Sequence, residues 1–226
     1  MNSRSVTLIA ALTVSSGCVP FRQPAALPVT PIELPTLDDA AADSLLVDVQ
    51  SLDSTFAVDI RYATANNFTG AVLPGYEGNR AYLRAEAAAA LALVNADLRL
   101  QGHRLRIFDA YRPVRASEAM VQWAERSNRA DLLRDGYIAS RSRHNLGAAV
   151  DVTLTGIVSG VDLDMGTRYD LFGHAAHTEN ARGPVARNRQ LLRQAMERHG
   201  FESYDKEWWH FSYAVDNPVR FDKTVR

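Results

Sequence analysis

The chain has 226 residues, 46% of them hydrophobic and 23% charged, which is enough for one well-buried domain and short for two. Lys and Arg total 25 against 26 for Asp and Glu, so no basic surface is expected and nucleic acid is excluded as a partner. The single cysteine, Cys18, excludes an internal disulfide framework.

The first residues predict an export signal. Arg4 precedes the apolar run VTLIAALTV, and the small residues SSG follow it. The run is short for a transmembrane helix, and Cys18 stands where a bacterial lipoprotein signal places its lipidated cysteine. Such signals usually carry an aliphatic residue where this chain has the first serine of SSGC, so simple cleavage and a buried helix remain as alternatives. We expect the protein in the periplasm or outer envelope, bound to the membrane only through lipid at Cys18.

Three segments follow from the composition. Residues 1–17 are the expected signal, and residues 18–43 form a tether because prolines recur between positions 20 and 35 with few large apolar residues between them. Residues 44–226 form the expected domain, since hydrophobic periodicity begins there.

Strands and helices of the domain are predicted from periodicity and from helix-ending glycines. We expect strands at 56–63, 104–108, 148–154 and 209–215 and helices at 83–98, 115–133 and 188–199, with Gly136 and Gly200 after the last two helices. This order with short connections predicts an α+β fold: one domain with a mainly antiparallel central sheet flanked by helices.

The segment SRHNLGAAVD combines a histidine, a glycine and a carboxylate. His144 and Asp151 are seven residues apart, so a continuous strand would place them on opposite faces. Gly147 permits a tight turn that brings His144 back toward Asp151. We therefore expect the two side chains to converge.

A second segment, EWWH, supplies Glu207 and His210. A regular strand would also separate these two, so we expect a bend before a strand that begins at position 209 or 210. Two imidazoles and one carboxylate, from His144, His210 and Asp151, make a reasonable zinc set that leaves a fourth position for water. Glu207 would then be the base that takes the proton of the zinc-activated water.

Ordinary roles compete with this hypothesis. A lone histidine is more often a core or surface residue and a lone carboxylate a solvated charge, so spacing alone leaves both interpretations open. Trp208 and Trp209 are expected in the core or the pocket wall. His174 and His177 are a rival metal pair, but no third ligand of suitable spacing stands near them.

From about Asp59 onward the chain resembles the D-alanyl-D-alanine dipeptidases of the VanX type, within the zinc D,D-peptidases that share a hedgehog-like fold. The resemblance rests on IRYATANNFTG, GYE, DAYRP, SRHNLGAAVDVTL, MGTRYD and GFESYDKEWWH. Within these, the S-x-H-x-x-G-x-A-x-D and E-x-x-H patterns keep their spacing. The resemblance implies a hedgehog/D,D-peptidase-like fold and one Zn²⁺ per chain.

Residue by residue, the resemblance implies a role for each site position. It makes His144, Asp151 and His210 the zinc ligands, Glu207 the catalytic base and Arg112 the arginine that stabilises the transition state. The substrate ammonium would bind Asp170, and the remaining small-pocket positions would be Ser142, Tyr62 and Tyr76.

Three functions are compared on this basis. The first is hydrolysis of D-alanyl-D-alanine or a closely related small dipeptide, for which an ammonium anchor at Asp170 selects. The second is a D,D-carboxypeptidase or endopeptidase acting on peptidoglycan peptides, which needs an open cleft. The third is a non-catalytic zinc-containing lipoprotein that binds wall peptides, and Glu207 disfavours it because a binding module needs no base. The N-terminal signal and tether lie outside the resemblance and favour wall turnover or salvage over a role in vancomycin resistance.

Overall fold

The computed structural model describes residues 33–37 and 39–226. Its compact unit runs from Leu34 to Arg226 and so begins ahead of the expected start at position 44. The predicted signal, Cys18 and most of the tether lie outside the described residues. Within the described part, no helix has both the length and the apolar character required to cross a bilayer.

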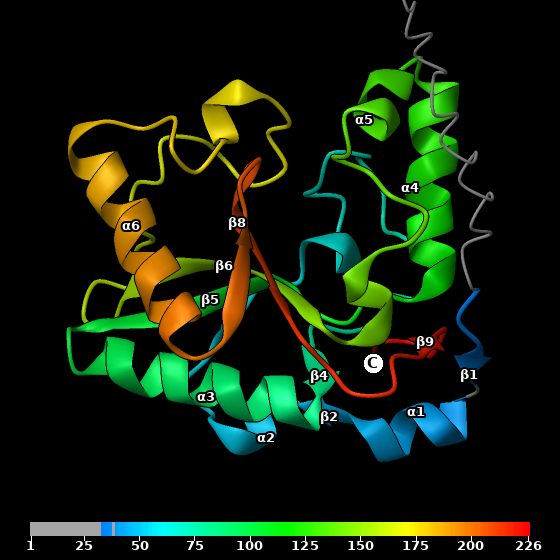
Figure 1. Cartoon of the computed structure of the whole chain (residues 1–226), viewed down its shortest axis with the longest axis horizontal. Helices are drawn as coiled ribbons and strands as arrows, with labels where there is room; N and C mark the ends of the chain where they lie inside the picture. Colours follow the sequence, from blue (N-terminus) through cyan, green and yellow to red (C-terminus); the bar gives the residue numbers. More distant parts are fainter. Residues whose placement is uncertain (1–32, 38) are drawn as a thin grey trace, which may run out of the picture. The chain divides into compact units, whose positions relative to one another are not determined.

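A five-stranded sheet forms the centre of the unit (Figure 1). Its strands lie in the order β3 (Ala57–Val58), β5 (His103–Asp109), β6 (Ala149–Gly156), β8 (Glu207–Tyr213) and β7 (Phe201–Tyr204). β3 is parallel to β5, and every other pairing is antiparallel. This confirms the predicted α+β fold with a mainly antiparallel sheet.

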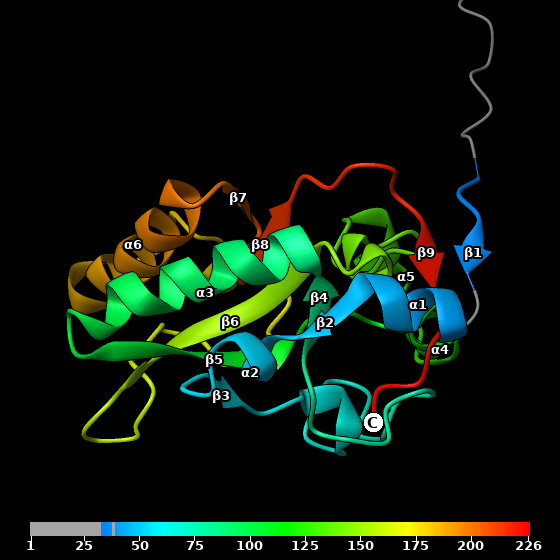
Figure 2. The same cartoon turned by 90° about the horizontal axis from the view of Figure 1, so that it is seen from below.

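Helices α3 (Ala85–Arg99) and α6 (Gly183–Arg198) contact each other and the sheet (Figures 1 and 2). The central strand β6 is buried at every position except its last. Apart from Asp151, its AVDVTL segment is largely apolar and β-branched, which is typical of a strand enclosed on both faces.

The other helices and strands of the described residues lie outside the five-stranded sheet. The helices are α1 (Asp39–Leu45), α2 (Val49–Leu52), α4 (Val114–Arg126) and α5 (Ala130–Arg134), and the 3₁₀ turns are η1 (Arg61–Ala63), η2 (Arg143–Leu146) and η3 (His174–Ala176). Two small sheets pair β2 (Leu46–Asp48) with β4 (Tyr82–Arg84) and β1 (Thr36–Leu37) with β9 (Arg220–Phe221).

Two predicted elements are shorter than expected. The single helix expected at 115–133 is wrong: α4 ends at Arg126, and Asn128 takes a left-handed backbone with φ 56° before α5 begins. Asparagine tolerates that conformation better than most residues, so the chain turns there. The strand expected at 56–63 also stops early, because Ile60 leaves the ladder and donates its amide to the side chain of Asn79 at 2.7 Å.

The turn expected at Gly147 is present. Gly147 has φ 62°, directly after η2. A Cβ atom there would lie 2.5 Å from Leu46 Cδ2 and 3.1 Å from the backbone nitrogen of Arg84. Only glycine therefore fits both the conformation and the space. The turn brings His144 back beside the start of β6, where Asp151 lies.

The bend expected before position 209 is replaced by an irregularity inside β8. The strand begins at Glu207, and Asp151 of β6 lies opposite His210. On the other side, Ser203 pairs with Phe211 but Tyr204 pairs with Glu207, so one step along β7 spans four residues of β8. Such a bulge re-aims side chains, which explains how Glu207 and His210 both line one pocket.

The last residues form a strap, residues 222–226, across the loop that carries Tyr76. Val225 is buried, bridges to Tyr76 in parallel, and exchanges backbone hydrogen bonds of 2.8 Å with Gly75 and Glu77. The hydroxyl of Tyr111 donates to the carbonyl of Lys223 at 2.8 Å. The strap therefore fixes the loop on which Tyr76 stands.

Candidate active site

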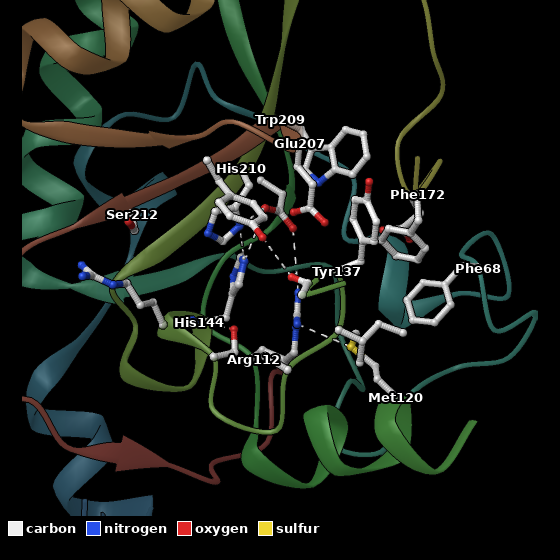
Figure 3. Close-up of a pocket in the computed structure, with 18 of the residues that line it drawn as sticks. Phe68, Arg112, Met120, Tyr137, His144, Phe172, Glu207, Trp209, His210 and Ser212 are labelled. Atoms are coloured by element: carbon white, nitrogen blue, oxygen red, sulfur yellow. Dashed lines mark hydrogen bonds and ion pairs between the residues drawn. The ribbon is translucent and has the colours of Figure 1, made fainter. Parts of the chain in front are cut away.

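A pocket of about 360 Å³ opens between β8, η2 and the loop after Met165. Its wall includes most of the residues singled out from the sequence: Tyr62, Arg112, Ser142, His144, Asp151, Asp170, Glu207 and His210. Figure 3 shows His144 and His210 on one side and Phe68, Tyr137 and Phe172 on the other. Segments spread over about two thirds of the chain therefore meet in this pocket.

Three donor atoms converge in its floor. His144 Nε2 lies 3.2 Å from His210 Nδ1 and 3.4 Å from Asp151 Oδ1, and the latter two are 2.9 Å apart. Ligands about 2.0–2.1 Å from a tetrahedral metal are roughly 3.3 Å from one another, which these separations approach. Among the described residues this is the one cluster of at least three such side chains that could hold a metal ion.

The surroundings of His144 and Asp151 suit metal ligands. His144 Nδ1 lies 2.6 Å from the carbonyl oxygen of Ala110, which only accepts, so Nδ1 carries the hydrogen and Nε2 keeps its lone pair. Asp151 Oδ2 accepts a hydrogen bond of 2.9 Å from the hydroxyl of Tyr169. Burial alone would raise the pKa of Asp151, but the two imidazoles hold it well below its usual range. Partners of this kind orient metal ligands.

Glu207 lines the same pocket at the start of β8 and is 7% exposed. Burial raises the pKa of its carboxyl well above the usual range, and the carboxylates of Asp151 and Asp170 act in the same direction. Arg112 opposes the shift. A carboxyl group tuned upward in this way suits proton transfer near neutral pH, because a general base works best with a pKa near the working pH.

Arg112 is clamped by a buried carboxylate that the sequence analysis did not single out. Asp109, which is fully buried, accepts from Arg112 Nε at 2.9 Å and lies 2.8 Å from Nη2. The hydroxyl of Tyr76 donates to the other oxygen of Asp109 at 2.6 Å. The signal was available, since Asp109 opens the DAYRP motif three residues before Arg112.

Tyr76 therefore lies in a different place from the one expected. It does not line the pocket but lies behind Arg112, where it holds Asp109. Ser142 does line the pocket, and its hydroxyl accepts from the backbone nitrogen of His144 at 3.2 Å as the N-cap of η2. The two residues thus position the arginine and the histidine.

Asp170 lies at the pocket wall with one oxygen free. Oδ1 accepts from the hydroxyl of Tyr62 at 3.1 Å, whereas Oδ2 is buried and has no hydrogen-bond partner within the described chain. Burial, and next the charge of Asp151, raise the pKa of Asp170 to about 8. An unpaired buried carboxylate oxygen costs free energy unless a ligand supplies a donor. Asp170 is thus suited to bind a cationic group.

The aromatic wall was not anticipated, apart from the tryptophans. Phe68 contacts Phe172 edge to face with ring centroids 5.1 Å apart, and Tyr137 contacts Phe172 at 5.6 Å. Trp209 lines the pocket and Trp208 is buried beside it, as expected of core or wall residues. Phe68, Tyr137 and Phe172 come from separate loops whose meeting has no local sequence signal.

The rival histidine pair has another use. The rings of His174 and His177 are 4.7 Å apart, but Nε2 of His177 lies 2.8 Å from the hydroxyl of Tyr137. His177 thus supports the aromatic wall through Tyr137.

Three donors that could hold a metal ion, beside a buried carboxyl and a clamped arginine, are the arrangement expected of a metal-dependent hydrolase. Comparison with known proteins narrows this class. Residues 42–224 match the Peptidase_M15 family model, described as D-ala-D-ala dipeptidase. The chain belongs to this family, and it is a metallopeptidase.

Curated relatives agree with that assignment. A D-alanyl-D-alanine dipeptidase of Enterococcus faecium is 37% identical over 169 residues, covering 68% of this chain and 83% of the relative. A protein of the same name from Escherichia coli K12 is 33% identical over 182 residues, covering 79% and 90%. A solved vancomycin-resistance D,D-pentapeptidase in complex with Zn(II) covers 63% of this chain and 78% of its own at 16% identity, with a TM-score of 0.40. A likeness as low as this last one has no bearing on function.

Proposed function

We propose that this protein hydrolyses D-alanyl-D-alanine or closely related small dipeptides with the help of one Zn²⁺. The observation that carries the proposal is that one pocket holds both a three-donor metal cluster and an unpaired buried carboxylate oxygen on Asp170. In a dipeptide the free amine and the scissile carbonyl belong to the same residue, so a pocket that holds both features suits such a substrate. The names of the relatives support the same substrate class.

Zinc fits the donor set of His144, His210 and Asp151, since nitrogen and carboxylate ligands at these separations match tetrahedral coordination with a position left open. When bound, zinc supplies a lowered pKa for water and polarises a carbonyl. Nδ1 of His144 is already satisfied by Ala110, so that ring is oriented before any ion arrives.

The pocket's other side chains divide the remaining work. Glu207 takes the proton from the attacking water and can return it to the leaving amine. Arg112, whose guanidinium Asp109 holds in place, donates hydrogen bonds to the oxygen that gains charge during attack. Preorganised donors of this kind need no rearrangement during the reaction.

Asp170 and Glu207 together separate the dipeptidase from its alternatives. A D,D-carboxypeptidase acting on peptidoglycan peptides has an amide where the dipeptide has its ammonium, and an amide cannot neutralise a buried carboxylate. A non-catalytic wall-peptide-binding protein has no use for Glu207 beside the metal cluster.

The cellular setting is proposed from the sequence alone. The apolar run and Cys18 favour an exported protein, held at the periplasm or outer envelope by lipid on that cysteine. Fractionation of cells that produce the parent and the Cys18→Ala variant would test this setting, and a soluble parent protein in the cytoplasm would contradict it.

The substrate proposal is tested by measuring D-alanine release from D-Ala-D-Ala and from a longer peptide that ends in D-Ala-D-Ala. We expect release from the dipeptide, little from the peptide, and loss of release with a chelator that added Zn²⁺ restores. Faster cleavage of the longer peptide would favour the carboxypeptidase instead. Tight binding of both compounds without release would favour the binding protein.

Replacing Asp170 with Asn is expected to reduce the preference for a free amine. The substitution keeps the size of the side chain but removes the charge that an ammonium needs in a buried site. The ratio of kcat/KM for D-Ala-D-Ala to that for its N-acetyl form measures this preference. Asp164→Asn, an exposed carboxylate on the same loop, is the control. An unchanged ratio in Asp170→Asn would remove this residue from substrate recognition.

A further inference from the structure

Tyr169 lies between the metal cluster and the amine-binding end of the pocket, and it has no role in the proposed chemistry. Its hydroxyl lies 2.9 Å from Asp151 Oδ2 and 3.0 Å from the hydroxyl of Tyr62. Tyr62 in turn donates to Asp170 at 3.1 Å. A continuous line of buried polar contacts therefore runs from the metal cluster to the amine-binding carboxylate.

The ring of Tyr169 is held on two sides. Its centroid lies 4.9 Å from the ring of Phe108 and 5.3 Å from that of Trp209. The next residue, Asp170, has φ 61°, a left-handed backbone that aspartate adopts more readily than most residues. With this conformation, the side chain of Tyr169 contacts the metal cluster while the side chain of Asp170 lies at the proposed amine site. The hydroxyl of Tyr169 thus has a fixed position.

The direction of the hydrogen bond follows from its partners. A carboxylate that binds a metal is ionised and only accepts, so Tyr169 must donate its single hydrogen to Asp151. Arg112 Nη2 lies 3.8 Å from the same oxygen, beyond hydrogen-bonding distance. Among the described residues, Tyr169 is therefore the hydrogen-bond donor to Asp151 Oδ2. His210 approaches the other oxygen, Oδ1.

We propose that Tyr169 is a positioning residue that holds Asp151 through Oδ2, so that Oδ1 faces the metal. The inference rests on the proposed metal site. Without the hydroxyl, Asp151 could rotate and turn either oxygen toward the histidines. Partners of metal ligands commonly contribute 10–100-fold to metal affinity, so we expect a loss of about that size.

The test compares the zinc affinity of full-length variants, measured by competition with a chromophoric chelator. Tyr169→Phe removes the hydroxyl and keeps the ring against Phe108 and Trp209. Tyr111→Phe is the matched control, because it removes another buried tyrosine hydroxyl that donates at 2.8 Å, to the carbonyl of Lys223 outside the pocket. We expect the Kd for Zn²⁺ to rise about 10-fold or more in Tyr169→Phe and to stay near the parent value in the control.

A third variant separates failure of this inference from failure of the metal site. His210→Ala should lose zinc if the metal site is as proposed, whatever Tyr169 does. If His210→Ala keeps the parent affinity, the metal site itself is wrong. If His210→Ala loses zinc while Tyr169→Phe matches Tyr111→Phe, the role of Tyr169 alone is overturned.

The preference for a free amine provides a second readout. Tyr169→Phe leaves the hydrogen bond between Tyr62 and Asp170 in place, so we expect zinc affinity to fall more than this preference. Loss of the preference with unchanged zinc affinity would place Tyr169 at the amine end only and overturn the proposal.

Discussion

Glu207→Gln is expected to keep zinc and lose turnover by about 100-fold or more, the scale of a missing general base. Glutamine preserves the size of the side chain and its hydrogen-bonding capacity but cannot accept the proton of the attacking water. Glu207 is three residues from the proposed ligand His210, and the irregular pairing of β8 turns both into the pocket. The ligand cluster itself is untouched by the change.

Metal analysis and steady-state kinetics on the same preparation check this expectation. Glu202→Gln, on the neighbouring strand β7 and exposed to solvent, is a control for loss of one carboxylate near the site. Near-normal kcat in Glu207→Gln with one equivalent of zinc would show that another group accepts the proton. Loss of zinc in that variant would instead assign Glu207 to the metal.

Arg112→Lys is expected to lower kcat by about 100- to 1,000-fold, as loss of a transition-state hydrogen-bond donor does. Lysine keeps a positive charge beside the buried Asp109, so the fold is not left with an uncompensated charge. What is lost is the planar guanidinium that contacts Asp109 through two nitrogens while facing the pocket.

This variant is checked by its kinetics with D-Ala-D-Ala, and its zinc content and thermal unfolding show whether the metal site and the fold are intact. We expect kcat to fall far more than KM rises, because the hydrogen bonds form only as charge develops on the carbonyl oxygen. A rise in KM with unchanged kcat would make Arg112 a substrate-binding residue. An Arg61→Lys variant, which changes an arginine outside this pocket that forms an ion pair with Asp59, controls for the substitution itself.

Local signals made most of the metal cluster predictable. His144, Gly147 and Asp151 stand within eight residues, and the expected convergence of His144 and Asp151 required a tight turn, which Gly147 supplies with φ 62°. The antiparallel sheet was likewise predictable, from the order of the predicted strands and helices. Periodicity is a local property, and these features depend on short stretches of chain.

Long-range contacts were not predictable in this way. Nothing near Tyr169 in the sequence indicates that its hydroxyl reaches Asp151, eighteen residues earlier, on another element. The displacement of Tyr76 from the pocket depends on the strap, and the four-residue step in β8 depends on its pairing with β7. The split between α4 and α5 has a local cause in Asn128, but helix propensity gives such a residue too little weight.

The strap also bears on the order in which the molecule folds. Val225 pairs with Tyr76 from the far end of the sequence, and Tyr76 in turn holds the carboxylate that clamps Arg112. Contacts between residues so distant in sequence form late and slowly, because a large loop must close first. During synthesis from the N-terminus, Arg112 leaves the ribosome long before the residues that complete its support. We therefore expect a nascent chain to acquire its secondary structure well before it acquires activity.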